Sequence, residues 1–176
     1  MHNSNKCIIP ECYIDSCLIE VLLVADKDFV NHHKGNGKVA KEMQESFESE
    51  FCLGIIDEDK EQLDYLKMFD EKKTTEYLKL WKHKTKQHFI IQIRPVIERW
   101  ILKICEENEI NIKDYNLPTD LKDLLRITKS VSSRKDERLL KLFKQMKNKN
   151  CAPVIELKNW VEFLKINKYN SNLDLL

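Results

Sequence analysis

Short apolar runs that alternate with helical patterns in the first 60 residues constrain the fold of this chain most strongly. The runs KCIIP (6–10) and FCLGII (51–56) are short and apolar, as buried parallel strands are. Between them, residues 15–22 and 39–48 carry apolar side chains at helical spacing, and DFVNHH (28–33) is a brief extended piece. This strand-helix-strand-helix-strand order predicts an α/β fold with a mainly parallel, Rossmann-type sheet and flanking helices.

The remainder of the chain is predicted to form one more helix, a hairpin and a helical C-terminal part. Residues 77–93 contain two apolar segments on either side of a polar stretch, the pattern of a β-hairpin, and residues 61–71 are expected to be helical. Further helical patterns occupy 94–108, where Pro95 is expected at the first helical position, 117–130, 133–149 and 152–168. We divide the chain into an α/β region with the hairpin (1–94) and a helical region packed on it (95–176), as one folding unit, because no flexible linker separates them.

The near-zero net charge of this chain gives no general attraction to polyanions. The chain has 30 Lys and Arg residues against 29 Asp and Glu, so any attraction to nucleic acid or to an anionic membrane must come from a local patch. No apolar run approaches the roughly 20 residues that span a bilayer, and MHNSNK lacks the apolar core of a secretory signal. We therefore expect a cytoplasmic protein with reduced cysteines that does not bind membranes.

Acidic residues follow two of the predicted parallel strands. Glu11 follows the first strand, and Asp57 and Asp59 follow the strand at 51–56. The loops that carry chemistry in a parallel sheet leave the carboxyl ends of its strands, so Glu11 would face the two aspartates if these strands are neighbours. Carboxylate oxygens of this kind suit Mg²⁺ or Mn²⁺. The alternative is a solvated polar turn at Asp57 and Asp59, and helix capping at Asp15.

Two motifs resemble the Toprim domain, and most closely that of the overcoming-lysogenisation-defect nucleases. PECYIDSCLIEVLL (10–23) is similar to the strand-Glu-Gly-x-x-Asp-helix opening of that family, and GIIDEDKE (54–61) to its Asp-x-Asp turn. The resemblance covers about the first 60 to 95 residues, and Cys12 stands where the family usually has Gly. It implies Mg²⁺- or Mn²⁺-dependent phosphodiester processing of nucleic acid. By this resemblance the catalytic residues are Glu11, Asp57 and Asp59, the same three and Glu98 hold metal, and Asp15 supports Glu11.

Other positions are predicted to contact substrate or its phosphate: Asp15, His32, His33, Lys34 and Lys60. The histidines and Lys34 belong to NHHKGNGK, which could cradle a phosphate or be a plain glycine loop before a helix. The hairpin tip KHKTKQH (82–88) could grip a nucleic-acid backbone or be a solvated turn that protects a sheet edge. The alternative function is a noncatalytic Toprim-fold module that binds nucleic acid or a separate partner protein, in phage defence or mobile-element biology.

Overall fold

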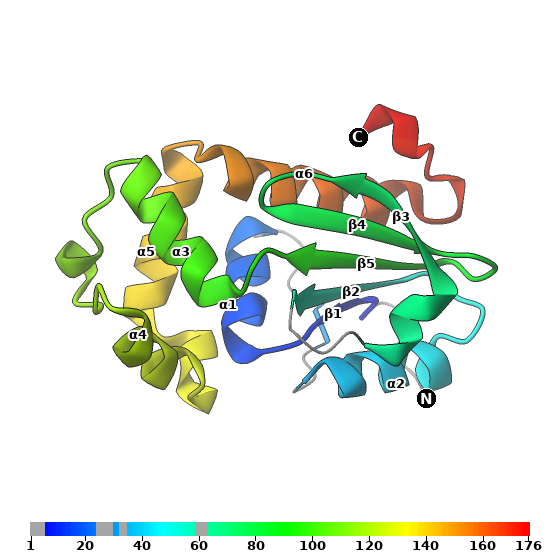
Figure 1. The fold of residues 1–176 in the computed structure, drawn as a ribbon, viewed down its shortest axis with the longest axis horizontal. Helices are drawn as coiled ribbons and strands as arrows, with labels where there is room; N and C mark the ends of the chain where they lie inside the picture. The colour runs from blue at the N-terminus through cyan, green and yellow to red at the C-terminus, as the bar shows by residue number, and fades with distance from the viewer. Residues whose placement is uncertain (1–5, 24–29, 32–34, 59–62) are drawn as a thin grey trace.

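A five-stranded mixed sheet forms the centre of the computed structural model, which describes residues 6–23, 30–31, 35–58 and 63–176 (Figure 1). The strands lie in the order β1-β2-β5-β4-β3. They are β1 (Ile8–Pro10), β2 (Cys52–Asp57), β3 (Phe69–Thr74), β4 (Leu78–His83) and β5 (His88–Ile93). The pairs β1–β2 and β2–β5 are parallel, whereas β5–β4 and β4–β3 are antiparallel. The α/β class and the hairpin are confirmed, and the sheet is mixed because the hairpin and β3 extend its parallel half with antiparallel strands.

Six α-helices belong to the described part of the chain: α1 (Tyr13–Leu22), α2 (Asn36–Ser46), α3 (Ile97–Glu107), α4 (Leu121–Thr128), α5 (Glu137–Asn148) and α6 (Ala152–Asn167). Short 3₁₀ turns also occur at Asp64–Met68, Ile112–Tyr115, Val131–Lys135, Lys168–Asn170 and Leu173–Leu175. Among these helices none has the length and apolar character needed to cross a membrane. An isolated parallel bridge joins Val30 to Ile8 on the outer side of β1, at the position of the predicted extended piece.

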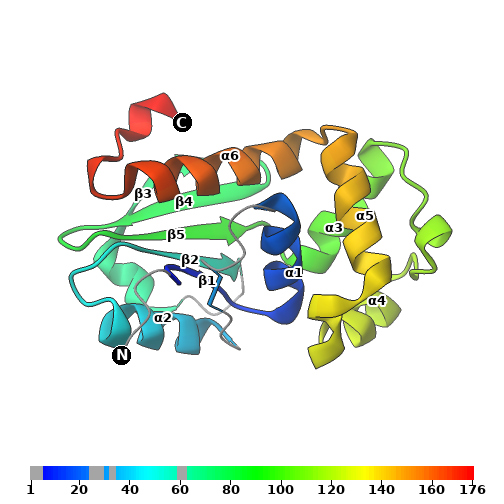
Figure 2. The same cartoon turned by 180° about the vertical axis from the view of Figure 1, so that it is seen from behind.

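The two faces of the sheet are covered by different helices. Gly54 of β2 faces α2 so closely that a Cβ atom there would lie 3.0 Å from Sδ of Met43. Side chains alternate between the faces of a strand, and the row of residues next to that of Gly54 includes Lys73 of β3. The Lys73 ammonium lies 5.8 Å from the ring centroid of Trp160 in α6. Helices α2 and α6 therefore lie on opposite faces, as the front and back views show (Figures 1 and 2).

Two predicted features are wrong in detail. Within the predicted helix 61–71, the described residues 63–71 form no α-helix: a 3₁₀ turn spans Asp64–Met68, and β3 begins at Phe69. The pairing of β3 with the edge strand β4 outweighs the local helical pattern. Pro95 is not the first residue of a helix, because α3 begins at Ile97 with Val96 as its N-cap. Pro95 instead precedes the cap and follows a cis peptide bond.

The helical C-terminal region packs against the carboxyl ends of the parallel strands. The arrowheads of β2 and β5 point toward α1, α3, α4 and α5 in both views (Figures 1 and 2). Trp100 of α3 and Phe143 of α5 are fully buried. The Lys147 ammonium of α5 donates to the backbone carbonyls of Val21 and Leu22 in α1, at 3.2 Å each. The region beyond residue 94 therefore surrounds the end of the sheet where the sequence places the acidic residues.

Candidate functional site

Glu11 lies at the carboxyl end of β1, directly beside the end of β2. Its backbone N–H donates to the carbonyl of Ile55 (2.9 Å), and its carbonyl accepts from the N–H of Gly35 (3.0 Å). Its side-chain Oε2 accepts from the backbone N–H of Asp57 (3.1 Å). The prediction that the strands before Glu11 and Asp57 are neighbours is confirmed by the parallel β1–β2 pair.

Asp57 is the last residue of β2, and its side chain caps a helix. Its Oδ1 accepts from the backbone N–H of Ile97 (2.9 Å), an N–H that has no intrahelical partner because Ile97 is the first residue of α3. Burial raises the pKa of Asp57 to about 10, and the nearby carboxylates of Asp15, Glu11 and Glu98 act in the same direction. At neutral pH the surroundings of Asp57 therefore favour its protonated form.

Asp15 lies in the first turn of α1, where it forms a capping box with Cys12. Its Oδ2 accepts from the backbone N–H of Cys12 (3.1 Å), and its own N–H donates to Sγ of Cys12 (3.4 Å). The side chain is fully buried, and its Oδ1 has no hydrogen-bond partner among the described residues. Burial raises the pKa of Asp15 to about 7; Glu11 and Glu98 add to this shift, and the hydrogen bonds with Cys12 oppose it. Asp15 thus caps the helix and also carries an unmatched oxygen.

Glu98, in the first turn of α3, is the second buried acid of this region, after Asp15. It is 6% exposed, and its Oε1 accepts from Oγ1 of Thr128 at the end of α4 (2.5 Å). Thr128 is itself 2% exposed. Thr128 was not predicted as a site residue, because no local pattern indicates that a threonine contacts a carboxylate thirty positions earlier in the chain.

We call Glu11, Asp15, Asp57 and Glu98 the carboxylate cluster. The charged groups that act most strongly on Asp57 are the other three members, so the cluster is held together against mutual repulsion. Glu58, the next residue after Asp57, differs: although its partial burial acts in the opposite direction, Lys79 (2.8 Å) and Arg94 (2.9 Å) hold the pKa of Glu58 below its usual range. Lys79 and Arg94 therefore place positive charge beside Glu58, whereas the described charged groups that most affect the pKa of Asp57 are carboxylates.

The chemistry of the carboxylate cluster suits a hard divalent cation, although its side chains are not arranged as a finished site. Oxygen atoms of carboxylates are the ligands that Mg²⁺ and Mn²⁺ prefer, and Oδ1 of Asp15 is a buried acceptor without a donor. Within the described ranges, no three His, Cys, Asp or Glu side chains are grouped so that they could hold a metal ion. Asp59, His32, His33, Lys34 and Lys60 lie outside the described residues.

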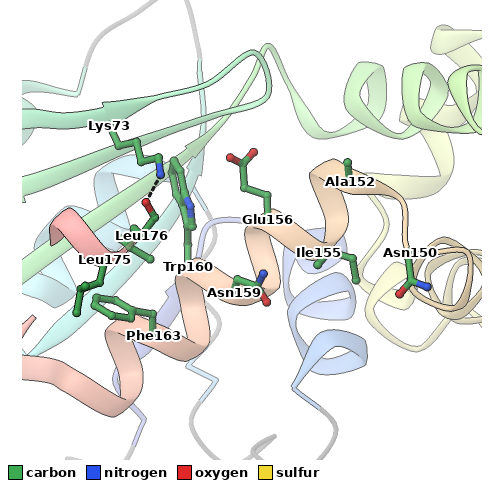
Figure 3. Close-up of a pocket in the computed structure, with 10 residues that line it drawn as sticks. All are labelled: Lys73, Asn150, Ala152, Ile155, Glu156, Asn159, Trp160, Phe163, Leu175 and Leu176. Atoms are coloured by element: carbon green, nitrogen blue, oxygen red, sulfur yellow. Dashed lines mark hydrogen bonds between the residues drawn. The ribbon is translucent and has the colours of Figure 1, made fainter. Parts of the chain in front are cut away.

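A separate groove of about 620 Å³ lies along α6, away from the carboxylate cluster. Trp160, Phe163 and Leu176 contribute to its lining, and Lys73 donates to the backbone oxygen of Leu176 across it (Figure 3). No member of the carboxylate cluster lines this groove. A hollow of this size is therefore not the place where the acidic residues of the sequence converge.

No family model, curated protein or solved structure matches this chain. The carboxylate cluster lies at the carboxyl end of the parallel strands, a common position for binding sites in α/β proteins, and two of its members, Asp15 and Glu98, are buried.

Proposed function

We propose that this chain is a Toprim-type protein that processes phosphodiester bonds of nucleic acid with Mg²⁺ or Mn²⁺. One observation carries the proposal: two buried carboxylates, Asp15 and Glu98, and two half-buried ones, Glu11 and Asp57, gather at the carboxyl ends of parallel strands. Burial together with like charge raises the pKa of Asp57 to about 10. Acids that repel one another in a buried place are typical of sites that receive a cation.

In this proposal Glu11, Asp57 and Asp59 hold the metal, and Glu98 is the acid available for a second ion. The bound ion supplies positive charge that offsets the negative charge developing on the scissile phosphate. The alternative role of Glu11 is that of general acid or base, because its Oε2 accepts from the Asp57 N–H (3.1 Å) and its carboxylate is thereby held beside Asp57. Asp15 positions this part of the loop by holding the Cys12 N–H, one residue after Glu11.

A second candidate, the noncatalytic binding module, is favoured by a different observation. No metal-ready group of three ligands exists among the described side chains, and Cys12 stands where the Toprim family usually has Gly. Sγ of Cys12 is occupied as the cap of α1. In this second proposal the fold binds nucleic acid or a separate partner protein without cutting a bond, in phage defence or mobile-element biology.

Calorimetric titration with Mg²⁺ and Mn²⁺ tests the first proposal. We expect saturable binding to the wild type that is lost in Asp57→Ala/Asp59→Ala. The matched control is Asp70→Ala/Glu71→Ala, which removes two exposed acids from β3 and should bind metal as the wild type does. Cleavage assays on single- and double-stranded DNA and RNA follow with the same three proteins.

The outcomes separate the two candidates. Metal binding that depends on Asp57 and Asp59, with cleavage that disappears in the same variant, supports the enzyme. Metal binding without cleavage supports the binding module, and no metal binding in the wild type contradicts a metal centre in the carboxylate cluster.

A further inference from the structure

The positive charge of this chain is concentrated in one part of the helical region. Residues 121–150 contain ten Lys or Arg side chains and three Asp or Glu, although the whole chain has 30 and 29. The rest of the chain therefore has an excess of acids, and the near-zero net charge conceals a basic part. We call residues 121–150, which comprise α4, the 3₁₀ turn Val131–Lys135 and α5, the basic helical segment.

Most lysines of the basic helical segment are available to a partner, whereas its arginines, Lys147 and Lys149 are used within the fold. Arg126, Arg134 and Arg138 form ion pairs with Asp123, Glu20 and Asp136. Five lysines are exposed, and their ammonium groups make no ion pair or hydrogen bond with the described residues: Lys122, Lys129, Lys135, Lys141 and Lys144. Helical spacing places Lys122 with Lys129 on one side of α4, and Lys141 with Lys144 on one side of α5.

The basic helical segment touches the carboxylate cluster directly. Thr128 at the end of α4 donates to Glu98 (2.5 Å), and the next residue is the exposed Lys129. The turn that follows is held from inside, because Oγ of Ser133 donates to the carbonyl of Thr128 (2.8 Å). Val131, in the same turn, is 66% exposed. The exposed Lys129 is thus only one residue away from Thr128, which contacts the buried Glu98.

We propose that the basic helical segment binds the phosphodiester backbone of the nucleic acid on which the carboxylate cluster acts. Exposed lysines contact phosphates as point charges and do not read bases, so the binding depends on salt and depends little on sequence. The charge complements a polyanion, and its position beside Glu98 lets a bound strand extend to the cluster. This inference rests on the proposed function, since it names the surface that brings the substrate to that site.

Charge reversal at three exposed lysines tests the proposal. The variant Lys129→Glu/Lys135→Glu/Lys144→Glu changes the basic helical segment and leaves the carboxylate cluster unaltered. The matched control Lys67→Glu/Lys72→Glu/Lys84→Glu makes the same change of charge at exposed lysines near the hairpin tip. Fluorescence anisotropy with labelled single- and double-stranded DNA and RNA, in EDTA, measures binding without any contribution from a metal ion.

We expect the wild type to bind these oligonucleotides with an affinity that falls steeply between about 50 and 200 mM salt. The variant in the basic helical segment should bind at least about tenfold more weakly, with a shallower dependence on salt, because it loses phosphate contacts. The hairpin control should keep the wild-type affinity. Circular dichroism checks that all three proteins are folded.

Three results would overturn the proposal: no binding by the wild type at low salt, an equal loss in both variants, or binding to phosphatidylserine vesicles in place of oligonucleotides. The test also separates this inference from the proposed function. If binding maps to the basic helical segment but no metal binds the cluster, the inference stands and the proposed chemistry falls. If the protein cleaves nucleic acid and the Lys129/Lys135/Lys144 variant has an unchanged KM, the inference falls alone.

Discussion

Two clusters of buried or half-buried polar side chains lie at opposite ends of the paired strands β2 and β5. They differ in how the free-energy cost of removing polar groups from water is offset. At the amino end, Tyr65, His83 and His88 form what we call the histidine cluster. The Tyr65 hydroxyl and Nδ1 of His88 lie 2.7 Å apart, and Nδ1 of His83 accepts from the backbone N–H groups of Lys86 (2.9 Å) and Thr85 (3.1 Å). Burial lowers the pKa of His88 to about 4, and Lys86 and His83 act in the same direction.

In the carboxylate cluster at the other end, the acidic side chains destabilise one another's charged forms. Burial raises the pKa of Asp15 to about 7 and that of Asp57 to about 10, and like charges strengthen both shifts. A neutral imidazole can be buried at neutral pH at moderate cost, whereas several carboxylates cannot share a buried place without protons or a cation. The histidine cluster is therefore part of the packed core, whereas the carboxylate cluster lowers the stability of the fold, as the proposed cation site would.

The largest effect is expected at the histidine cluster. His88→Ala leaves the Tyr65 hydroxyl without its partner and opens a cavity beneath β5, so the free energy of unfolding should fall by about 2–4 kcal/mol. Urea denaturation measures this loss. Because His88 lies at the far end of the strand, Mg²⁺ binding by the folded variant should match that of the wild type. Loss of Mg²⁺ binding with the fold intact would break the distinction between the two clusters.

The dependence of stability on pH should have opposite sign for the two clusters. The folded-state pKa of His88 is lowered, so its contribution to stability is present above its unfolded value of 6.5 and is lost as the pH falls toward about 4. The folded-state pKa of Asp57 is raised, so its contribution is present below 3.8 and is lost as the pH rises toward about 10. Acidification from pH 6.5 to 5.0 therefore opposes the histidine and favours the aspartate.

Relative to the wild type, His88→Gln should gain about 2 kcal/mol of unfolding free energy over that acidification, and Asp57→Asn should lose about the same amount. Urea denaturation at several pH values, in EDTA, measures both differences. If the free energy of unfolding depends on pH in the same way in all three proteins, neither His88 nor Asp57 has the shifted pKa given above.

The smallest effect is expected from removing one charge of the carboxylate cluster. Asp57→Asn keeps an Oδ1 acceptor for the Ile97 N–H and removes an acid that the fold must keep protonated at neutral pH, so the metal-free protein should gain about 1 kcal/mol of stability. Thermal unfolding with and without Mg²⁺ checks this, and Mg²⁺ should stabilise the wild type alone. Glu58→Gln is the control: it should not gain stability, because Glu58 is paired with Lys79 and Arg94. Lower stability of Asp57→Asn in EDTA would contradict the proposed repulsion.

A large share of the candidate site could be predicted from the sequence. Glu11 and Asp57 follow short apolar runs, and strands of one parallel sheet bring their carboxyl ends to the same edge, so the contact between these residues was predictable. Glu98 was marked by its resemblance to an acidic residue of nuclease-type Toprim proteins. Thr128 was not predictable, because its contact with Glu98 depends on how α4 packs against α3.

The sequence by itself determined the α/β class, the β4–β5 hairpin and the helical character of the C-terminal part, because these follow from the local spacing of apolar side chains. It also determined that ten basic residues fall between 121 and 150. Only the tertiary structure decided that β3 joins the edge of the sheet and that Asp15 is fully buried. It also decided that Thr128, the residue before the exposed Lys129, contacts Glu98. Burial, and with it the pKa of a carboxylate, depends on which elements pack together, and no spacing along the chain contains that information.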